Sequence, residues 1–153
     1  MNVLMVCLGN ICRSPMAEGV LRTLAREHGL AINVDSAGTS DYHVGDPPDH
    51  RAQQAMRRHG MDISALRGRQ FSRMDFDRSD IILVMDQANL RNARAMAPDA
   101  EAAGKVRLIM DHAPDHLHRE VPDPYYGGEE GFEAVFQMLV VACKGLLQEF
   151  ARR

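Results

Sequence analysis

The sequence has no tryptophan and only eight aromatic residues, three tyrosines and five phenylalanines, in a chain of 153 residues. It has three cysteines, and this odd number favours free thiols in a reducing compartment over a disulfide scaffold. A net charge of −3 gives no basis for expecting binding to nucleic acid or to an anionic membrane. We expect no apolar run of membrane-spanning length and no cleaved leader, because the N-terminus is apolar for only a few residues. The expected location is therefore the cytoplasm.

The rest of the composition is ordinary for a soluble protein, with 45% hydrophobic and 25% charged residues. A chain of this length can bury an ample core, so we expect a single domain that spans residues 1–153. Short apolar runs predict strands at 3–6, 32–35, 81–85 and 106–110. Helical spacing predicts helices at 15–28, 48–59, 86–96 and 131–152. This alternation predicts an α/β fold, a doubly wound parallel sheet of about four strands with helices on both faces.

The most informative segment runs from position 7 to position 15 and has the sequence C-L-G-N-I-C-R-S-P. The apolar run before it predicts a buried strand, and the amphipathic spacing after it predicts a helix. Ser14 is a good candidate for the N-cap of that helix, and Pro15 suits its first turn. The segment is therefore expected to form a loop at the carboxyl end of the first strand. Backbone N–H groups and a helix N-terminus attract an anion at such a position.

Cysteine and arginine at the two ends of this loop suit phosphate chemistry. The helix N-terminus and Arg13 both stabilise Cys7 as a thiolate, which is the nucleophilic form. Arg13 offers a planar fork that can hold two phosphate oxygens at once. Gly9 and Asn10 tolerate a positive φ, so the backbone can curve closely around the anion. A buried structural cysteine in an ordinary turn is the alternative, since C-x5-R spacing by itself is a weak signal.

A second segment, at positions 122–128, has the sequence P-D-P-Y-Y-G-G. Prolines on both sides of Asp123 hold it in a stiff extended or turn geometry. Asp123 belongs either to an exposed turn or to a catalytic loop. In a catalytic loop it would act as a general acid, because a departing phenolic oxygen needs a proton that a carboxylic acid can supply.

V-C-L-G-N-I-C-R-S-P at positions 6–15 and D-P-Y-Y-G at positions 123–127 resemble the low-molecular-weight protein tyrosine phosphatases. Segments at 35–40, 45–49, 57–60 and 84–91 are also similar to this family, so the resemblance covers essentially the whole chain. It implies hydrolysis of phosphotyrosine and aryl phosphates through a phosphocysteine intermediate. Cys7 would be the nucleophile, Arg13 would bind the phosphate, and Asp123 would serve as general acid and then as general base.

The resemblance also implies the remainder of the substrate site. Contacts to the substrate are expected from the loop residues Leu8, Gly9, Asn10, Ile11, Cys12 and Ser14. Tyr42, Tyr125 and Tyr126 are expected to form the walls of a crevice that admits a planar aromatic ring.

The polar residues of the loop are expected to support one another. The Ser14 hydroxyl is expected to donate to the Cys7 sulfur, and Asn10 is expected to fix the loop through Ser36 as the family pattern implies. Many animal members have a histidine where this chain has Ala65. Any contribution of that histidine to the stability of the loop is therefore missing.

Neither a metal nor another cofactor is expected, because Arg13 and the loop amides supply the positive field that phosphate needs. The expected partner is a phosphotyrosine-containing protein, of which a tyrosine kinase is one example. We expect the protein to be a monomer.

Three other functions are weighed against this one. Thioredoxin-coupled arsenate reduction needs two further cysteines, and none occurs between residues 13 and 142. A non-catalytic phosphotyrosine-binding module would be expected to lack the nucleophile or the acid, and both are present. A phosphoarginine phosphatase would resemble relatives that carry threonine at the position of Ile11 and lack the double tyrosine.

A few other residues are expected to have a structural role or allow two interpretations. Asp86 is expected to cap a helix rather than to take part in catalysis. Cys12 is either a buried filler or the partner of Cys7 in a reversible, protective disulfide. Cys143 is expected in the core, and the histidines near position 115 are expected in a solvated loop rather than around a metal.

Overall fold

The computed structural model describes residues 1–152 of the chain. Its elements are β1 (Asn2–Cys7), α1 (Arg13–Glu27), β2 (Asn33–Gly38), α2 (His50–Arg58), α3 (Met74–Arg78), β3 (Ile81–Val84), α4 (Gln87–Ala95), α5 (Ala100–Ala103), β4 (Val106–Leu108), the 3-10 helix η1 (Ile109–His112) and α6 (Glu129–Ala151).

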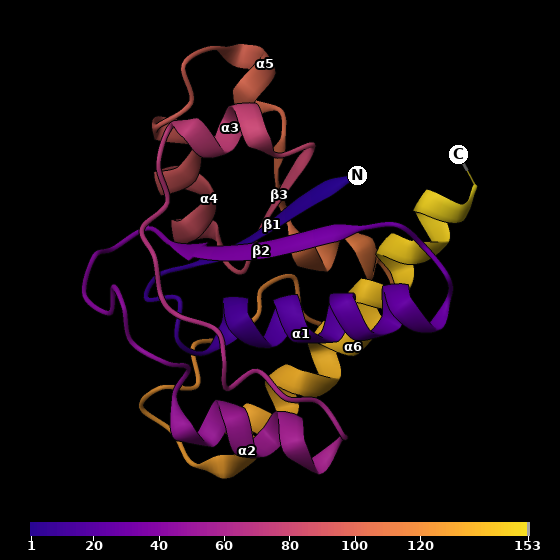
Figure 1. The fold of residues 1–153 in the computed structure, drawn as a ribbon. Helices are drawn as coiled ribbons and strands as arrows, with labels where there is room; N and C mark the ends of the chain where they lie inside the picture. The colour runs from indigo at the N-terminus through magenta and orange to yellow at the C-terminus, as the bar shows by residue number, and fades with distance from the viewer. Residues whose placement is uncertain (153) are drawn as a thin grey trace.

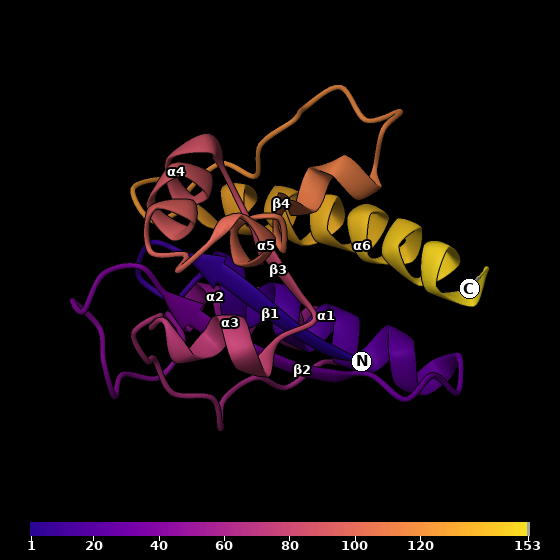
Figure 2. The same cartoon turned by 90° about the horizontal axis from the view of Figure 1, so that it is seen from above.

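The four strands form one parallel sheet in the order β2-β1-β3-β4 (Figures 1 and 2; β4 is labelled in Figure 2). The predicted doubly wound α/β sheet is therefore confirmed. The chain moves from β1 outward to β2 and then returns to the other side of β1 to form β3, so the strand order reverses between β1 and β3. Ligands of open parallel sheets bind beyond the carboxyl ends of the strands at such a reversal. Cys7, the last residue of β1, lies at this point.

Helices cover both faces of the sheet (Figures 1 and 2). Val3 and Met5 of β1 belong to the larger core, which α1, α2 and α6 cover. Leu4 and Val6 point to the opposite face and belong to a smaller core with side chains from the α3–α5 region. Because side chains alternate along a strand, burial on both faces explains why β1 is apolar at every position from 3 to 6.

The predicted elements are all present, with shifts of a few residues at their ends. The fourth strand stops at Leu108, and the next four residues form η1 instead of continuing the strand to position 110. The short helices α3 and α5 were not predicted, because five and four residues are too few to display a helical period.

Helix α6 departs from one expectation. This helix of 23 residues is long and apolar enough to cross a membrane, with a mean hydropathy of 1.4 over an 18-residue stretch, although no such run was expected. The core helix of a soluble protein passes the same test, so this is weak evidence for a membrane span. Phe132, Leu139 and Leu146 of α6 are fully buried in the larger core, which accounts for the apolar character of this helix.

Candidate active site

The loop of residues 8–12 connects β1 to α1 and forms a cradle at the carboxyl end of the sheet. Helix α1 begins at Arg13, with Cys12 at the N-cap position and no side-chain hydrogen bond to the cap. The prediction that Ser14 caps this helix was therefore wrong, because Ser14 lies inside the first turn. Pro15 is also in the first turn, as predicted. An N-terminus without a side-chain cap leaves its amides available for an anion.

Asn10 holds the shape of the cradle. Its φ of +58° is the only positive value found for a non-glycine residue among residues 1–152. Its side-chain amide donates to the Oγ of Ser14 at 2.7 Å and to the Oγ of Ser36 at 3.0 Å. Its Oδ1 accepts from the backbone N–H of Arg69 at 3.0 Å. These contacts fix a strained backbone position, and they include the expected link to Ser36. Gly9 was also expected to allow a positive φ, but none is observed there.

The sulfur of Cys7 lies on the floor of the cradle, where the residue is only 2% exposed. The backbone N–H of Asn10 donates to Sγ at 3.2 Å, and the Ser14 Oγ lies 3.0 Å from Sγ. Because Ser14 already accepts from the Asn10 amide, its own hydrogen is free to point toward the sulfur. Both contacts stabilise negative charge on the sulfur.

A buried carboxyl group lies behind the cradle. Glu18 of α1 is 2% exposed, and its Oε1 accepts from the Ser36 hydroxyl at 2.7 Å. Its other oxygen accepts from Arg22. Burial raises the pKa of Glu18, while the hydrogen bonds from Ser36 and Arg22 lower it by less. The Ser36 hydroxyl donates its hydrogen to Glu18, so the Ser36 oxygen is left to accept from the Asn10 amide. This fixes which group donates and which accepts along the chain of hydrogen bonds that leads to Cys7.

Arg13 is anchored on the side away from the cradle. Its Nη1 donates to the Asp86 carboxylate at 2.6 Å and to the backbone carbonyl of Val121 at 3.0 Å. Asp86 also accepts from the N–H of Asn89 and caps α4. The predicted cap is therefore present, and the sequence did not reveal that the same carboxylate holds Arg13. These anchors keep the guanidinium at the cradle with only 3% of its side chain exposed.

Asp123 lies at the open side of the cradle. One of its carboxylate oxygens is 3.8 Å from Arg13 Nη2, and the other accepts from the backbone N–H of Tyr125 at 3.0 Å. Its side chain is 39% exposed. The two distant sequence motifs therefore meet, with the carboxyl group facing the space above the phosphate loop.

A crevice of about 290 Å³ opens above the cradle. It is lined by Cys7, Leu8, Gly9, Ile11, Cys12, Arg13, Tyr42, His43, Asp123, Tyr125 and Tyr126. The site residues expected from the sequence all line this crevice except Asn10 and Ser14, which are buried beneath it. His43 is the one lining residue that the sequence analysis did not single out.

A family model described as low molecular weight phosphotyrosine protein phosphatase matches residues 2–153. The chain belongs to this family. It is 46% identical over 154 residues to a putative low molecular weight protein-tyrosine-phosphatase of Synechocystis, with 99% of this chain and 98% of the relative covered.

Solved structures agree with this membership. A protein tyrosine phosphatase from Entamoeba histolytica with Hepes in its active site has a TM-score of 0.95 and 36% identity, covering 99% of this chain and 97% of that one. An arginine phosphatase from Drosophila has a TM-score of 0.92 and 35% identity, covering 98% of each chain. The chain is thus a protein tyrosine phosphatase by family, and it is also similar to a protein named for another phosphoamino acid.

The phosphatase has three free cysteines in different settings. Cys7 and Cys12 both line the crevice, whereas Cys143 is fully buried in α6, as expected. Burial raises the pKa of Cys12 well above its ordinary value, and the nearby Asp49 raises it further. Burial also raises the pKa of Cys143 to about 12. Cys12 is therefore a neutral thiol beside the nucleophile.

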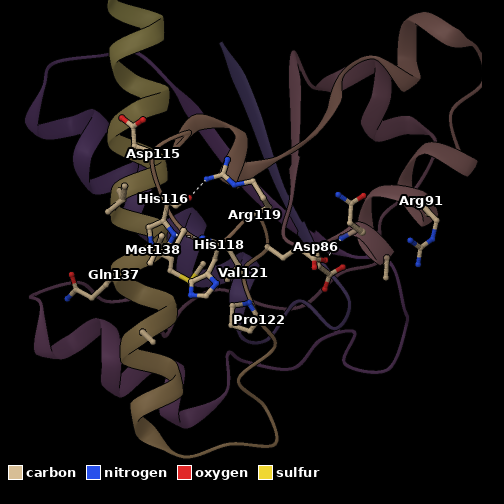
Figure 3. Close-up of a pocket in the computed structure, with 16 residues that line it drawn as sticks. Asp86, Arg91, Asp115, His116, His118, Arg119, Val121, Pro122, Gln137 and Met138 are labelled. Carbon is tan, nitrogen blue, oxygen red and sulfur yellow. Dashed lines mark hydrogen bonds between the residues drawn. The ribbon is translucent and has the colours of Figure 1, made fainter.

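A second, larger cavity of the phosphatase, of about 1240 Å³, lies between α4, α6 and the loop of residues 115–122 (Figure 3). Its lining includes Asp86 and Val121, the two anchors of Arg13. The arginine thus faces the crevice while its anchors face the other cavity. His116 and His118 line this second cavity, and no cluster of three potential metal ligands is found within residues 1–152.

Proposed function

We propose that this phosphatase hydrolyses phosphotyrosine in proteins in two chemical steps, with Cys7 as the nucleophile. The observation that carries the proposal is the position of the Cys7 sulfur. It lies at the floor of a crevice, accepts a hydrogen bond from the Asn10 amide and contacts the Ser14 hydroxyl. Arg13 and Asp123 line the same crevice.

In the first step, the phosphate of the substrate binds in the cradle, where Arg13 and the loop amides hold its oxygens. The Cys7 thiolate attacks the phosphorus, so an S–P bond forms and the bond between phosphorus and the phenolic oxygen breaks. Asp123 is protonated at this stage and gives its proton to that oxygen, which leaves as a phenol. The cradle supplies fixed positive charge to the transferring group.

In the second step, the Asp123 carboxylate removes a proton from a water molecule that attacks the phosphocysteine. A P–O bond to the water oxygen forms and the S–P bond breaks, which releases inorganic phosphate and returns Cys7 to a thiolate. The Ser14 hydroxyl, 3.0 Å from the sulfur, stabilises the departing thiolate. Asp123 is thereby protonated again and ready for the next substrate.

Arg13 contributes geometry as well as charge. A guanidinium binds two phosphate oxygens at once only when its plane is held in place. The contacts to Asp86 and Val121 fix that plane before substrate arrives, so no reorganisation is needed during transfer.

The proposed substrate class is an aryl phosphate. The crevice is lined by Tyr42, Tyr125 and Tyr126, and Ile11 in the cradle is apolar, which favours a flat aromatic group over a guanidino group. A phosphoserine side chain is shorter than phosphotyrosine, so its phosphate would stop above the thiolate. The partner we propose is a phosphotyrosine-containing protein, with a tyrosine kinase as one example. We further infer a single-domain, monomeric, cytoplasmic enzyme.

Replacing the nucleophile tests the mechanism. The Cys7→Ser variant should fold normally and lose turnover of p-nitrophenyl phosphate, because a serine hydroxyl is a much weaker acid than a thiol and stays protonated. Cys143→Ala, which removes a thiol outside the crevice, is the matched control and should keep its activity. Steady-state rates, with circular dichroism as a check on folding, decide the matter. Near-normal turnover by Cys7→Ser would eliminate the phosphocysteine mechanism.

A panel of substrates tests the substrate class. Peptides of one sequence carrying phosphotyrosine, phosphoserine or phosphoarginine should differ in kcat/KM, with phosphotyrosine hydrolysed far faster than the other two. The physical reason is the combination of the tyrosine-lined crevice with Ile11. Ile11→Thr should raise the relative rate on phosphoarginine. Comparable rates on phosphoarginine in the unmodified enzyme would instead align it with the arginine phosphatase that it resembles in fold.

A further inference from the structure

The loop that carries Asp123 is attached to the fold on both sides of that residue. On the upstream side, Val121 is held through both of its backbone polar groups. On the downstream side, the carbonyls of Tyr125 and Gly127 accept hydrogen bonds from the guanidinium of Arg51, at 2.9 and 2.8 Å. Arg51 belongs to α2, so the downstream attachment joins segments that are 74 and 76 positions apart in the chain.

The guanidinium of Arg51 is itself held by a carboxylate. Its Nε donates to the Oδ1 of Asp49 at 3.1 Å, and its Nη2 donates to the Oδ2 of the same residue at 3.1 Å. Two parallel hydrogen bonds of this kind fix the plane of the guanidinium. The backbone N–H of Asp49 in turn donates to the carbonyl of Ile11 in the cradle, at 2.8 Å. The orientation of Arg51 is therefore set relative to the phosphate loop.

Aromatic rings hold the same guanidinium. The Cζ of Arg51 lies over the ring of Phe132, 4.7 Å from its centroid, and over the ring of Tyr125, 5.6 Å from its centroid. A guanidinium at such distances is attracted to the face of an aromatic ring. Phe132 is fully buried in the core, so it gives Arg51 a fixed support. Arg51 is thus a rigid link between α2, α6 and the acid loop.

The backbone of Tyr125 connects Arg51 to the general acid. Its carbonyl accepts from Arg51, and its N–H donates to the Oδ1 of Asp123 at 3.0 Å. A shift of this backbone would therefore move the group that orients the Asp123 carboxyl. A proton donor has to lie within hydrogen-bond reach of the leaving oxygen, and a misplacement of about 1 Å is costly.

We propose that Arg51 is a positioning residue for the general acid. By holding the Tyr125 and Gly127 carbonyls, it keeps the Asp123 carboxyl where it reaches the oxygen of the leaving group. Arg51 is not among the residues that line the crevice, so it acts through the backbone of the acid loop and not on the substrate. Asp49 assists by fixing the guanidinium plane. The inference rests on the proposed function, because it requires Asp123 to be the proton donor.

The test compares two leaving groups. We measure kcat/KM for phenyl phosphate and for p-nitrophenyl phosphate, because phenol is a much weaker acid than p-nitrophenol and its departure depends more on a donated proton. Arg51→Ala should lower kcat/KM for phenyl phosphate about 10- to 100-fold, since the acid remains but is displaced. The loss for p-nitrophenyl phosphate should be much smaller. The inhibition constant of inorganic phosphate should not change, because the cradle is intact.

Two other variants of α2 sharpen the test. Arg51→Lys keeps the positive charge, but an ammonium lacks the planar fork that spans two carbonyls and a carboxylate. It should show the same dependence on the leaving group, and it replaces Arg51→Ala if that variant is unstable. Arg57→Ala removes an exposed arginine of the same helix and should behave as the unmodified enzyme does. Thermal unfolding of each variant confirms that folded proteins are compared.

A double variant separates positioning from an independent effect. In an Asp123→Ala background, Arg51→Ala should cause little further loss on phenyl phosphate, because no proton donor remains to be positioned. Losses that multiply in the double variant would overturn the inference.

Three other results would also contradict it. Equal losses on both esters, together with weaker inhibition by phosphate, would mean that Arg51 supports the cradle through Asp49. Unchanged kcat/KM for phenyl phosphate in Arg51→Ala, or full activity of Arg51→Lys on that ester, would remove the role of the fork. Failure of the proposed function has a different signature, because Asp123→Ala itself would then show no dependence on the leaving group.

Discussion

The cradle and the rim of the crevice border the same cavity but are held in different ways. In the cradle, Asn10, Arg13 and Ser14 are at most 3% exposed. Asn10 and Arg13 make hydrogen bonds to other parts of the fold, and Ser14 accepts from Asn10. At the rim, Tyr42 is 75% and Tyr126 is 93% exposed. The difference shows that the fold specifies where the phosphate goes much more tightly than it specifies what the phosphate is attached to.

This contrast has a consequence for mutations. A change in the cradle alters the binding of the phosphoryl group, so it should affect every phosphate ester by a similar factor. A change at the rim or in the acid loop touches only the leaving group, so its effect should depend on which ester is used. The following predictions test that division.

The largest effect is expected from removing the proton donor. Asp123→Ala should slow phosphoryl transfer from phosphotyrosine by about 10²-fold or more, the usual scale for general acid catalysis. The deficit should shrink sharply for aryl phosphates with acidic phenols, because those phenolates depart without a proton. Rates of both proteins over a series of leaving groups measure this directly.

Asp77→Ala, which removes an exposed carboxylate of α3, is the control for the change in charge. If the Asp123→Ala deficit were the same for good and poor leaving groups, Asp123 would act on the cradle and not as a proton donor. The proposed division, in which the cradle binds the phosphoryl group and the acid loop acts on the leaving group, would then be wrong for Asp123.

A smaller effect is expected from the second thiol of the cradle. Cys12→Ser should retain most of the activity, since Cys12 is not part of the proposed chemistry. It should, however, lose recovery by a thiol reductant after exposure to peroxide. Peroxide oxidises the Cys7 thiolate to a sulfenic acid, and attack of the Cys12 sulfur on that group forms a disulfide and releases water. Burial raises the pKa of Cys12, so its neutral thiol is itself a poor target for peroxide.

Activity before peroxide, after peroxide and after dithiothreitol distinguishes the two readings of Cys12. Unchanged recovery in Cys12→Ser would make this residue a buried filler of the cradle. Cys143→Ala should behave as the unmodified enzyme does, because Cys143 lies in the core of α6.

The smallest effect is expected behind the cradle, at Glu18. Because burial raises the pKa of Glu18 in the folded state, its contribution to stability is fully present below the pKa of the unfolded chain and is lost as pH rises through the folded value. Glu18→Gln cannot titrate, so its stability relative to the unmodified protein should improve as pH rises from acid toward neutral. Urea unfolding at several pH values measures this trend.

An opposite trend for Glu18→Gln would mean that the hydrogen bonds from Ser36 and Arg22 outweigh burial in the folded protein. The catalytic rate of Glu18→Gln on different phosphate esters is a second test of this variant. A similar fractional change in rate on all phosphate esters would place Glu18 with the cradle, as its connection through Ser36 and Asn10 suggests.

Local patterns in the sequence were sufficient to predict the sheet, the four longer helices α1, α2, α4 and α6, and the cradle. A strand, a C-x5-R loop and an amphipathic helix are contiguous, so their spacing carries the structure of the phosphate site. The general acid could be named because stiff prolines flank Asp123 and because the segment resembles a known family.

Contacts between segments that are far apart in the chain could not be predicted from the sequence. Asp86 could be recognised as a helix cap from its neighbours, but its bond to Arg13 joins residues 73 positions apart. His43 lies in a loop with no periodic pattern, and only the tertiary contact with Gly9 brings it into the crevice. Glu18 was not singled out from the sequence, because nothing local indicates that it faces Ser36.

The attachment of Val121 has a consequence for protein engineering. Its N–H donates to the carbonyl of Met85, the residue that follows β3, and its carbonyl accepts from Arg13. A designer who transplants a new acid loop to change leaving-group preference therefore has to cut after Val121 and not before it. A graft that begins upstream would release the guanidinium from one of its two supports, and the borrowed loop would be attached to a damaged phosphate site.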